Sequence, residues 1–256
     1  MDDFDLLIDL YRHAGRQGPG GEAETRLAIT LSGLAPARGL RIADVGCGSG
    51  AATLVLARAL DAQVTAVDLV PAFLADLDAA AEAKELSDRI ETLVASMAEL
   101  PFEAEAFDAI WSEGAIYNIG FEHGIRAWRR FLKPGGVLAV SELTWFTRTR
   151  PAELEEHWRR EYPEVDTAAA KLAQLERQGY TPIGYFPLPV RCWLDNFYRP
   201  LEARFAAFLA RHDHSAEARA VVDADRTEIA LYERFSAFFG YGYYVARKLP
   251  ERPGRG

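Results

Sequence analysis

A short apolar run followed by three alternate glycines constrains this chain more than any other stretch. Residues Arg41–Val45 have the composition of a buried strand, and a helix-forming run covers Ala51–Leu60. Between them lie Gly46, Gly48 and Gly50. Glycine has no Cβ, so it allows a sharp turn and lets a ligand approach the main chain closely. The first N–H groups of the following helix have no partner within that helix. The pattern therefore predicts a strand–turn–helix unit that binds a nucleotide-type cofactor.

The composition of the whole chain limits its partners. The 256 residues carry a formal net charge of −9, which disfavours a broad basic surface for nucleic acid. No apolar run approaches the roughly 20 residues of a membrane span, and residues 1–5 are acidic, unlike the start of a signal peptide. Cys47 and Cys192 are too few for a disulfide framework or a thiolate zinc site. We expect a cytoplasmic protein without bound metal, nucleic acid or membrane insertion.

Short apolar runs alternate with helical runs over the centre of the chain. Strands are expected at Arg41–Val45, Gln63–Val67, Glu91–Ala95, Asp108–Trp111 and Gly136–Glu142, and helices near Ala51–Leu60, Pro71–Lys84 and Glu122–Leu132. Strands separated by helices of this length predict βαβ units and a parallel sheet. The Lys-Pro-Gly-Gly run at 133–136 predicts a tight turn between the last helix and its strand.

Helical segments flank this core on both sides. Residues 3–34 carry helical periodicity that the glycine-rich run 15–21 interrupts. Beyond Leu143, helices are expected at 151–160 and 166–178, an apolar segment at 180–190, a helical block at 195–239 and a strand at 241–249. We therefore expect a single domain. Its parts are an N-terminal helical lid (1–35), a cofactor-binding core (36–143), helical cap elements with a sixth strand (144–239) and the last strand (240–249).

Two classes of cofactor site use a glycine turn of this kind, and the glycine spacing separates them. A nicotinamide site favours G-x-G-x-x-G, with the third glycine three residues past the second. Here Gly50 follows Gly48 by two residues, and Asp44 precedes the turn. A second carboxylate, Asp68, ends the next expected strand, where it can accept hydrogen bonds from ribose hydroxyls. The spacing favours S-adenosylmethionine (SAM), and a nicotinamide-dependent oxidoreductase is the alternative.

Further motifs agree with SAM. They are Ser96–Phe102, Phe107–Ile110 and Leu132–Gly136, in addition to Asp44–Gly50 and Asp68. On these motifs the chain resembles the class I SAM-dependent methyltransferases, especially the small-molecule branch that is similar to quinone-biosynthesis enzymes. Residues 111–121, WSEGAIYNIGF, resemble one bacterial subfamily of that class. The resemblance implies an α/β fold with a Rossmann-like seven-stranded sheet of order 3-2-1-4-5-7-6, an antiparallel last strand and helical cap insertions.

The resemblance also implies which residues contact the methyl donor. Gly46, Gly48 and Gly50 would shape the turn around the methionine part of SAM, Asp44 would hold its amino end, and Asp68 would bind the ribose. The residues expected at the donor are Asp44, Gly46, Gly48, Gly50, Asp68, Leu69, Ser96, Met97, Glu113 and Gly18.

Two parts of this donor site need separate reasons. Ser96 stands where the family commonly has an acid that holds the adenine amino group, and it could serve together with the backbone around Met97. Gly18 belongs to the glycine-rich loop 17–21, which we expect to fold over the bound donor and exclude water, as lids do in other enzymes. A plain connecting turn is the alternative for this loop.

Four residues are candidates for the acceptor side. Methyl transfer from a sulfonium needs mainly proximity and orientation, with a base where the nucleophile carries a proton. Glu113 is the first candidate, as a base, as an anchor for a cationic acceptor or as a contact to the donor's amino group. Tyr117 could close the methyl pocket, His123 could act as a general base, and Glu142 could contact the acceptor. The structural alternatives are a helix-start carboxylate, core packing and a surface histidine.

Other conspicuous residues are better explained by structure. Trp193, Phe197 and Tyr198 recur at helical spacing, which is typical of packing. His212 and His214 lie at an expected helix end without a third ligand, so we interpret them as surface residues. The sequence thus predicts methyl transfer from SAM to a small molecule by a monomer or homodimer. A protein that binds SAM without catalysis, as a sensor or scaffold, is a further alternative.

Overall fold

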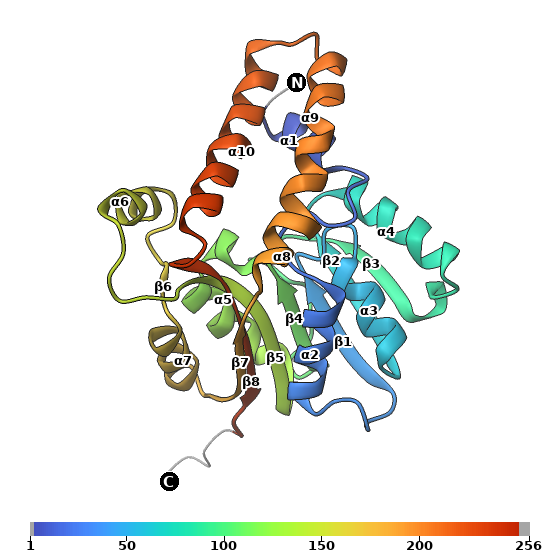
Figure 1. Cartoon of the computed structure of the whole chain (residues 1–256). Coiled ribbons are helices and arrows are strands. Elements are labelled where there is room, and N and C mark those ends of the chain that lie inside the picture. The colour runs from blue at the N-terminus through green and yellow to red at the C-terminus, as the bar shows by residue number, and fades with distance from the viewer. Residues whose placement is uncertain (1–2, 251–256) are drawn as a thin grey trace.

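The structure is a computed structural model that describes residues 3–250, and a single twisted sheet lies at its centre (Figure 1). The strand order is β3-β2-β1-β4-β5-β8-β7, and the two-residue β6 pairs with β5 outside this path. The strands are β1 (Leu40–Val45), β2 (Ala62–Asp68), β3 (Ile90–Val94), β4 (Phe107–Glu113), β5 (Leu132–Trp145), β6 (Asp166–Thr167), β7 (Tyr180–Pro187) and β8 (Phe239–Lys248).

Strand directions confirm the expected class I sheet. β3, β2, β1, β4 and β5 pair in parallel, whereas β8 runs antiparallel to both β5 and β7. β7 and β8 take the places of the expected sixth and seventh strands, so the predicted order and the antiparallel last strand are confirmed. Met1 and Asp2, the first residues of the expected N-terminal lid, lie outside the described residues.

Helices cover both faces of the sheet. One face packs against residues of α2 and α3, and the opposite face packs against α5 and α7. The helices are α1 (Asp3–Tyr11), α2 (Glu22–Ser32), α3 (Ala51–Ala59), α4 (Pro71–Ala83), α5 (Phe121–Trp128), α6 (Ala152–Glu161), α7 (Ala168–Arg177), α8 (Val190–Trp193), α9 (Arg199–Arg211) and α10 (Ala216–Phe235). Short helical segments are η1 (Ser87–Arg89), η2 (Ile116–Ile119), η3 (Arg129–Phe131) and the π-helical η4 (Leu194–Tyr198). None of the helices between residues 3 and 250 has the length and hydrophobicity of a membrane span.

The helices α1, α9 and α10 form a cap beyond the sheet. α9 and α10 rise side by side, and α1 lies between them near the top of the view (Figure 1). Arg204 of α9 donates a hydrogen bond to the Leu10 carbonyl (2.9 Å), and the Tyr11 hydroxyl donates to Asp225 of α10 (3.0 Å). The helical block expected at 195–239 is therefore split into separate helices, with the N-terminal helix packed between two of them.

One predicted helix begins later than expected. Asp166 and Thr167 form β6 against Thr144 and Trp145 of β5, so the helix predicted from Asp166 starts at residue 168. The Ala170 N–H then donates to the Thr167 side chain (3.4 Å), which caps α7. Pairing with the C-terminal end of β5 has therefore placed two residues of the expected helix in the sheet.

The Lys-Pro-Gly-Gly run does not separate a helix from a strand. β5 already begins at Leu132, and its register against β4 shifts between Phe107 and Ala109. Gly135 has a φ of 75°, in the left-handed region. The Lys-Pro-Gly-Gly run therefore forms an irregularity within the long strand β5. A glycine in the left-handed conformation occurs in β-bulges as well as in turns.

Candidate functional site

A cavity of about 570 Å³ lies where the carboxyl ends of β1, β2 and β4 meet the cap. Its lining includes every residue expected at the methyl donor except Gly50: Asp44, Gly46, Gly48, Asp68, Leu69, Ser96, Met97, Glu113 and Gly18. Of the other acceptor candidates Tyr117 lines it, whereas His123 and Glu142 do not. The sheet topology brings these donor residues together because parallel strands present their carboxyl ends at one edge.

The glycine turn adopts backbone conformations that favour glycine. Gly46, Gly48 and Gly50 have φ values of 74°, 54° and 81°. A Cβ added to Gly46 would lie 2.4 Å from the Cβ of Ala115, and one added to Gly50 would lie 2.1 Å from Leu77. Gly50 therefore serves close packing of the turn against α4, while Gly46 and Gly48 also face the cavity.

Asp68 is tied to the glycine turn by main-chain hydrogen bonds. The Gly48 N–H donates to Oδ2 (2.8 Å) and the Val70 N–H donates to Oδ1 (2.9 Å). Burial raises the pKa of Asp68, although these N–H groups oppose the shift. Each carboxylate oxygen can accept more than one hydrogen bond, so Asp68 can order the turn and still accept from a ligand in the cavity.

Asp44 is fully buried at the end of β1. The Thr53 hydroxyl of α3 donates to its Oδ2 (2.6 Å). Burial raises the pKa of Asp44 to about 7, and the Thr53 hydrogen bond only partly opposes this. A cationic group entering the cavity beside Asp44 would favour its charged form.

We expect the stability of the protein to depend on pH through Asp44. Its pKa rises from the ordinary 3.8 to about 7 on folding, so between these values the folded state binds more protons than the unfolded state. The free energy of unfolding therefore falls as pH rises, by at most about 1.4 kcal/mol per pH unit from this group. Urea unfolding between about pH 4 and 7 should show wild type losing stability relative to Asp44→Asn. A constant difference between the two proteins would contradict this assignment.

The N-terminal loop lies over the glycine turn. The Ser49 N–H and hydroxyl both donate to Gln17 Oε1 (2.8 and 3.0 Å), and the Gln17 amide donates to the carbonyls of Tyr11 and Ala14. Gly18 follows directly and lines the cavity. The loop is thus joined to the turn by Gln17, a contact that the sequence pattern did not single out.

Glu113 is the most connected side chain of the site. Its Oε1 accepts hydrogen bonds from the Thr25 hydroxyl (2.7 Å), the Tyr243 hydroxyl (3.0 Å) and the Trp111 indole (3.1 Å). Its Oε2 forms an ion pair with Arg16 of the N-terminal loop (2.5 Å), and the two side chains are only 6% and 14% exposed. This network holds the loop, α2, β4 and β8 together at the cavity.

Glu113→Gln should loosen the N-terminal loop. The substitution keeps the size of the side chain but removes the charge that pairs with Arg16, and hydrogen bonds to charged groups contribute about 1.5–3 kcal/mol. Hydrogen exchange of amides in residues 16–21 should become at least about tenfold faster, since about 1.4 kcal/mol corresponds to a factor of ten. Arg26→Gln, which breaks an exposed pair with Glu22, is the matched control and should leave this exchange unchanged. Equal exchange in all three proteins would show that the pair does not hold the loop.

The other two catalytic candidates lie outside the cavity lining. His123 is exposed on α5 and lies 3.3 Å from Arg126. Glu142 is fully buried in β5, where Lys171 of α7 donates to its Oε1 (3.0 Å). Burial raises the pKa of Glu142, and the Lys171 charge opposes this. Neither side chain reaches the cavity, because His123 lies at the surface beside Arg126 and Glu142 pairs with Lys171 inside the protein.

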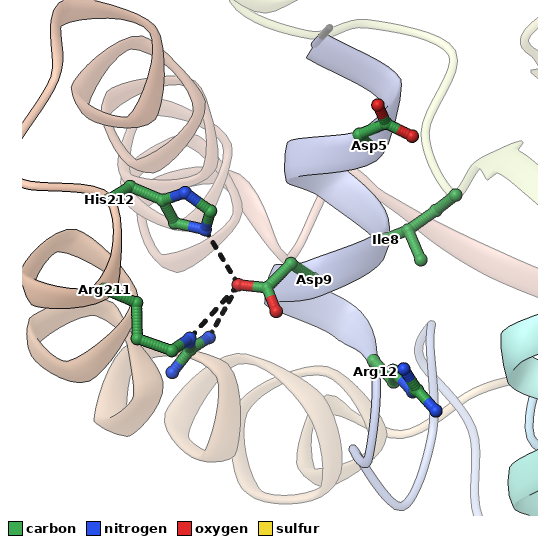
Figure 2. Close-up of a pocket in the computed structure, with 6 residues that line it drawn as sticks. All are labelled: Asp5, Ile8, Asp9, Arg12, Arg211 and His212. Carbon is green, nitrogen blue, oxygen red and sulfur yellow. Dashed lines mark hydrogen bonds and ion pairs between the residues drawn. The ribbon is translucent and has the colours of Figure 1, made fainter. Parts of the chain in front are cut away.

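A second, smaller cavity of about 370 Å³ lies between α1 and the end of α9 (Figure 2). Asp9 points toward Arg211 and His212, whose Nη2 and Nε2 atoms lie 2.8 and 2.9 Å from its Oδ2 (Figure 2). The hydrogen bonds from Arg211 and His212 lower the pKa of Asp9 against the effect of partial burial. Among residues 3–250 no group of three or more His, Cys, Asp or Glu side chains is placed to hold a metal. This cluster attaches α1 to the C-terminal end of α9.

Comparison with known proteins agrees with this geometry. Residues 43–140 match the family model described as a methyltransferase domain. A 27-O-demethylrifamycin SV methyltransferase from Amycolatopsis mediterranei is 33% identical over 123 residues, which cover 47% of this chain and 45% of that protein. The chain spans about half the length, or less, of the first curated relatives that it matches.

Solved structures share the fold over nearly the whole chain. A SAM-dependent methyltransferase from Geobacter sulfurreducens, in complex with S-adenosyl-L-homocysteine, has a TM-score of 0.76 at 19% identity and covers 95% of this chain and 96% of that one. The [4+2]-cyclase SpnF has a TM-score of 0.73 at 23% identity, with coverages of 96% and 93%.

The sheet order, the glycine turn and the acid that ends β2 define the class I methyltransferase fold. Residues 43–140 match a methyltransferase domain, and the chain is similar to SAM-dependent methyltransferases in sequence and fold. The subfamily suggested by residues 111–121 stays a prediction.

Proposed function

We propose that this chain transfers a methyl group from SAM to a small-molecule acceptor and releases S-adenosylhomocysteine. The observation that carries the proposal is the single cavity that joins the expected donor residues to aromatic side chains of the cap. The methyltransferase-domain match spans the glycine turn, Asp68 and Glu113. A cavity that continues past the donor residues offers room for a second reactant beside the first.

The donor half of the cavity has groups suited to each part of SAM. The left-handed backbone of Gly46 and Gly48 leaves the space that a Cβ would fill, which suits close approach of the methionine part. Asp44 would face its amino group and Asp68 the ribose hydroxyls. Ser96 would lie at the adenine. These assignments stay proposals for individual residues.

The chain contributes mainly placement and exclusion of water. Bound SAM supplies a methyl carbon that its sulfonium already activates. Holding the acceptor in line with that carbon converts a bimolecular step into an effectively unimolecular one. We assign Glu113 a positioning role, because its oxygens already accept four hydrogen bonds and its partner Arg16 holds the loop over the cavity.

Transfer of label from methyl-labelled SAM tests the proposal. The purified protein, incubated with labelled SAM and a set of small amines, phenols and carboxylic acids, should yield a labelled small molecule together with S-adenosylhomocysteine. Asp68→Ala serves as the control that should lose the product. Binding of S-adenosylhomocysteine without any labelled product would favour the non-catalytic alternative.

The fold alone does not decide between transfer and other uses of the cavity, because the [4+2]-cyclase SpnF shares it. Detection of a methylated product is therefore the criterion. A cytoplasmic location and the absence of nucleic-acid partners remain proposals that rest on composition, and a monomeric or dimeric state remains a proposal as well.

A further inference from the structure

The cap side of the cavity presents a carboxylate that the donor assignments do not use. Glu228 of α10 lines the cavity, and burial raises the pKa of its carboxyl. The hydroxyl of the buried Tyr198 donates to its Oε1 (2.8 Å). No hydrogen bond reaches its Oε2 from any residue between 3 and 250. One oxygen of Glu228 is therefore oriented by the protein, and the other is available to a ligand.

Aromatic side chains line the same cavity as this carboxylate. Tyr11, Tyr117, Phe197 and Tyr241 line the same cavity and come from α1, η2, η4 and β8. Burial first, and the nearby charge of Glu228 in addition, raise the pKa values of Tyr11, Tyr117 and Tyr241. The three phenol rings therefore lie within electrostatic range of one carboxylate and stay protonated.

A second carboxylate lies one helical turn earlier. Asp225 accepts a hydrogen bond from the Tyr11 hydroxyl through Oδ1, whereas its Oδ2 is buried without a partner among the described residues. Burial raises the pKa of Asp225 to about 6. Arg16 is the one Lys or Arg among the described residues that line the cavity, and it is paired with Glu113. Neither Glu228 nor Asp225 has a Lys or Arg partner among the described residues, and of the two Glu228 lines the cavity.

We propose that the acceptor half of this cavity binds a substituted ammonium group, and that the acceptor class is a small amine. Faces of aromatic rings attract cations, most strongly in desolvated sites, and a carboxylate adds a charge-assisted hydrogen bond. A neutral or anionic acceptor would leave Glu228 without a cationic partner in a partly dehydrated pocket. The role of this site in catalysis rests on the proposed methyl transfer, whereas binding of a cation at the site does not.

Glu228 can accept the proton that the nitrogen of a bound ammonium must lose before it is methylated. A bound primary or secondary ammonium would lose one proton to Glu228 Oε2, which frees the nitrogen lone pair. That lone pair forms the new N–C bond while the C–S bond breaks and leaves its electron pair on sulfur. The products are the methylated ammonium and S-adenosylhomocysteine, and the proton on Glu228 passes to solvent.

Choline and its neutral carbon isostere, 3,3-dimethyl-1-butanol, test the cation site directly. The two probes share their shape, and choline has no proton or lone pair on nitrogen, so binding is measured without turnover. Titrations of each probe into protein saturated with S-adenosylhomocysteine should show choline binding at least about tenfold more tightly, equal to about 1.4 kcal/mol. Glu228→Gln should remove most of this preference. Glu233→Gln, an exposed glutamate on the same helix, should keep it.

The outcomes separate this inference from the proposed function. Equal affinities for the two probes, binding of neither probe, or an unchanged preference in Glu228→Gln would overturn the cation site. Affinity for S-adenosylhomocysteine, measured in each variant, reports the donor half independently and shows that the variants fold. Choline preference without methylation of any amine, phenol or carboxylic acid would retain the cation site and contradict methyl transfer.

Discussion

Gly46→Ala is expected to abolish measurable donor binding and to destabilise the protein by roughly 2–5 kcal/mol. About 1–2 kcal/mol would come from a left-handed alanine, since Gly46 has a φ of 74°. Overpacking typically costs a further 1–3 kcal/mol, because the new Cβ would lie 2.4 Å from Ala115 Cβ and 3.0 Å from Met97. Relief of this clash must displace Ala115 or Met97, both of which line the cavity. Urea unfolding and calorimetric titration with S-adenosylhomocysteine measure the two effects.

Gly135→Ala is a matched control for backbone strain. Its φ of 75° is almost the same, but nothing lies within 4 Å of an added Cβ. We expect a loss of only about 1–2 kcal/mol from the left-handed conformation, with donor affinity unchanged. Similar stability losses in both variants, with donor binding intact in Gly46→Ala, would show that the close approach at Gly46 is unimportant.

Asp68→Ala is expected to weaken S-adenosylhomocysteine binding by roughly 10- to 100-fold, because hydrogen bonds to a charged group contribute about 1.5–3 kcal/mol. The carboxylate has two tasks: it accepts from the N–H groups of Gly48 and Val70, and it faces the cavity. Its removal therefore affects both ribose recognition and the order of the turn. The dissociation constant from calorimetry is the measured quantity.

Asp68→Asn separates these two tasks. The amide keeps one oxygen for the main chain but loses the charge and presents donors in place of the second acceptor. We expect an intermediate loss of affinity. Asp88→Ala, in η1 outside the cavity lining, should bind as wild type does. Wild-type affinity in Asp68→Ala would remove Asp68 from the donor site.

The central strands and helices could be predicted because the residues that indicate them lie close together in the sequence. The run Arg41–Val45, the alternate glycines and Asp68 each lie within a few residues of the strand end that they mark. Parallel pairing then places those ends at one edge. Predicted helix boundaries were wrong where pairing between distant segments determines them. Asp166, for example, pairs with β5 and the helix begins only after it.

The donor side of the candidate site was more predictable than the acceptor side. Its residues follow consecutive strands, whereas Glu228, Tyr11 and Phe197 reach the cavity from cap helices whose placement depends on tertiary packing. In the sequence, Glu228 is one acid in a polar helix. The one indication in the sequence was that Asp225 and Glu228 are one helical turn apart, and this spacing also occurs on many solvent-exposed helix faces.

The Glu113 network shows a different limit. The position of this acid at the end of β4 was predictable, but its role depends on Arg16, Thr25 and Tyr243, which are far apart in the chain. Only the folded structure reveals that its oxygens are already engaged. A carboxylate at a strand end is therefore a candidate for positioning as much as for chemistry.

Calorimetric titration with S-adenosylhomocysteine, with NADH titrated in parallel, tests the central claim most directly. We expect saturable binding of one S-adenosylhomocysteine per chain, strongly weakened in Asp68→Ala, and no saturable heat from NADH. Saturable NADH binding without binding of S-adenosylhomocysteine would contradict the methyl-donor site and favour a nicotinamide-dependent enzyme.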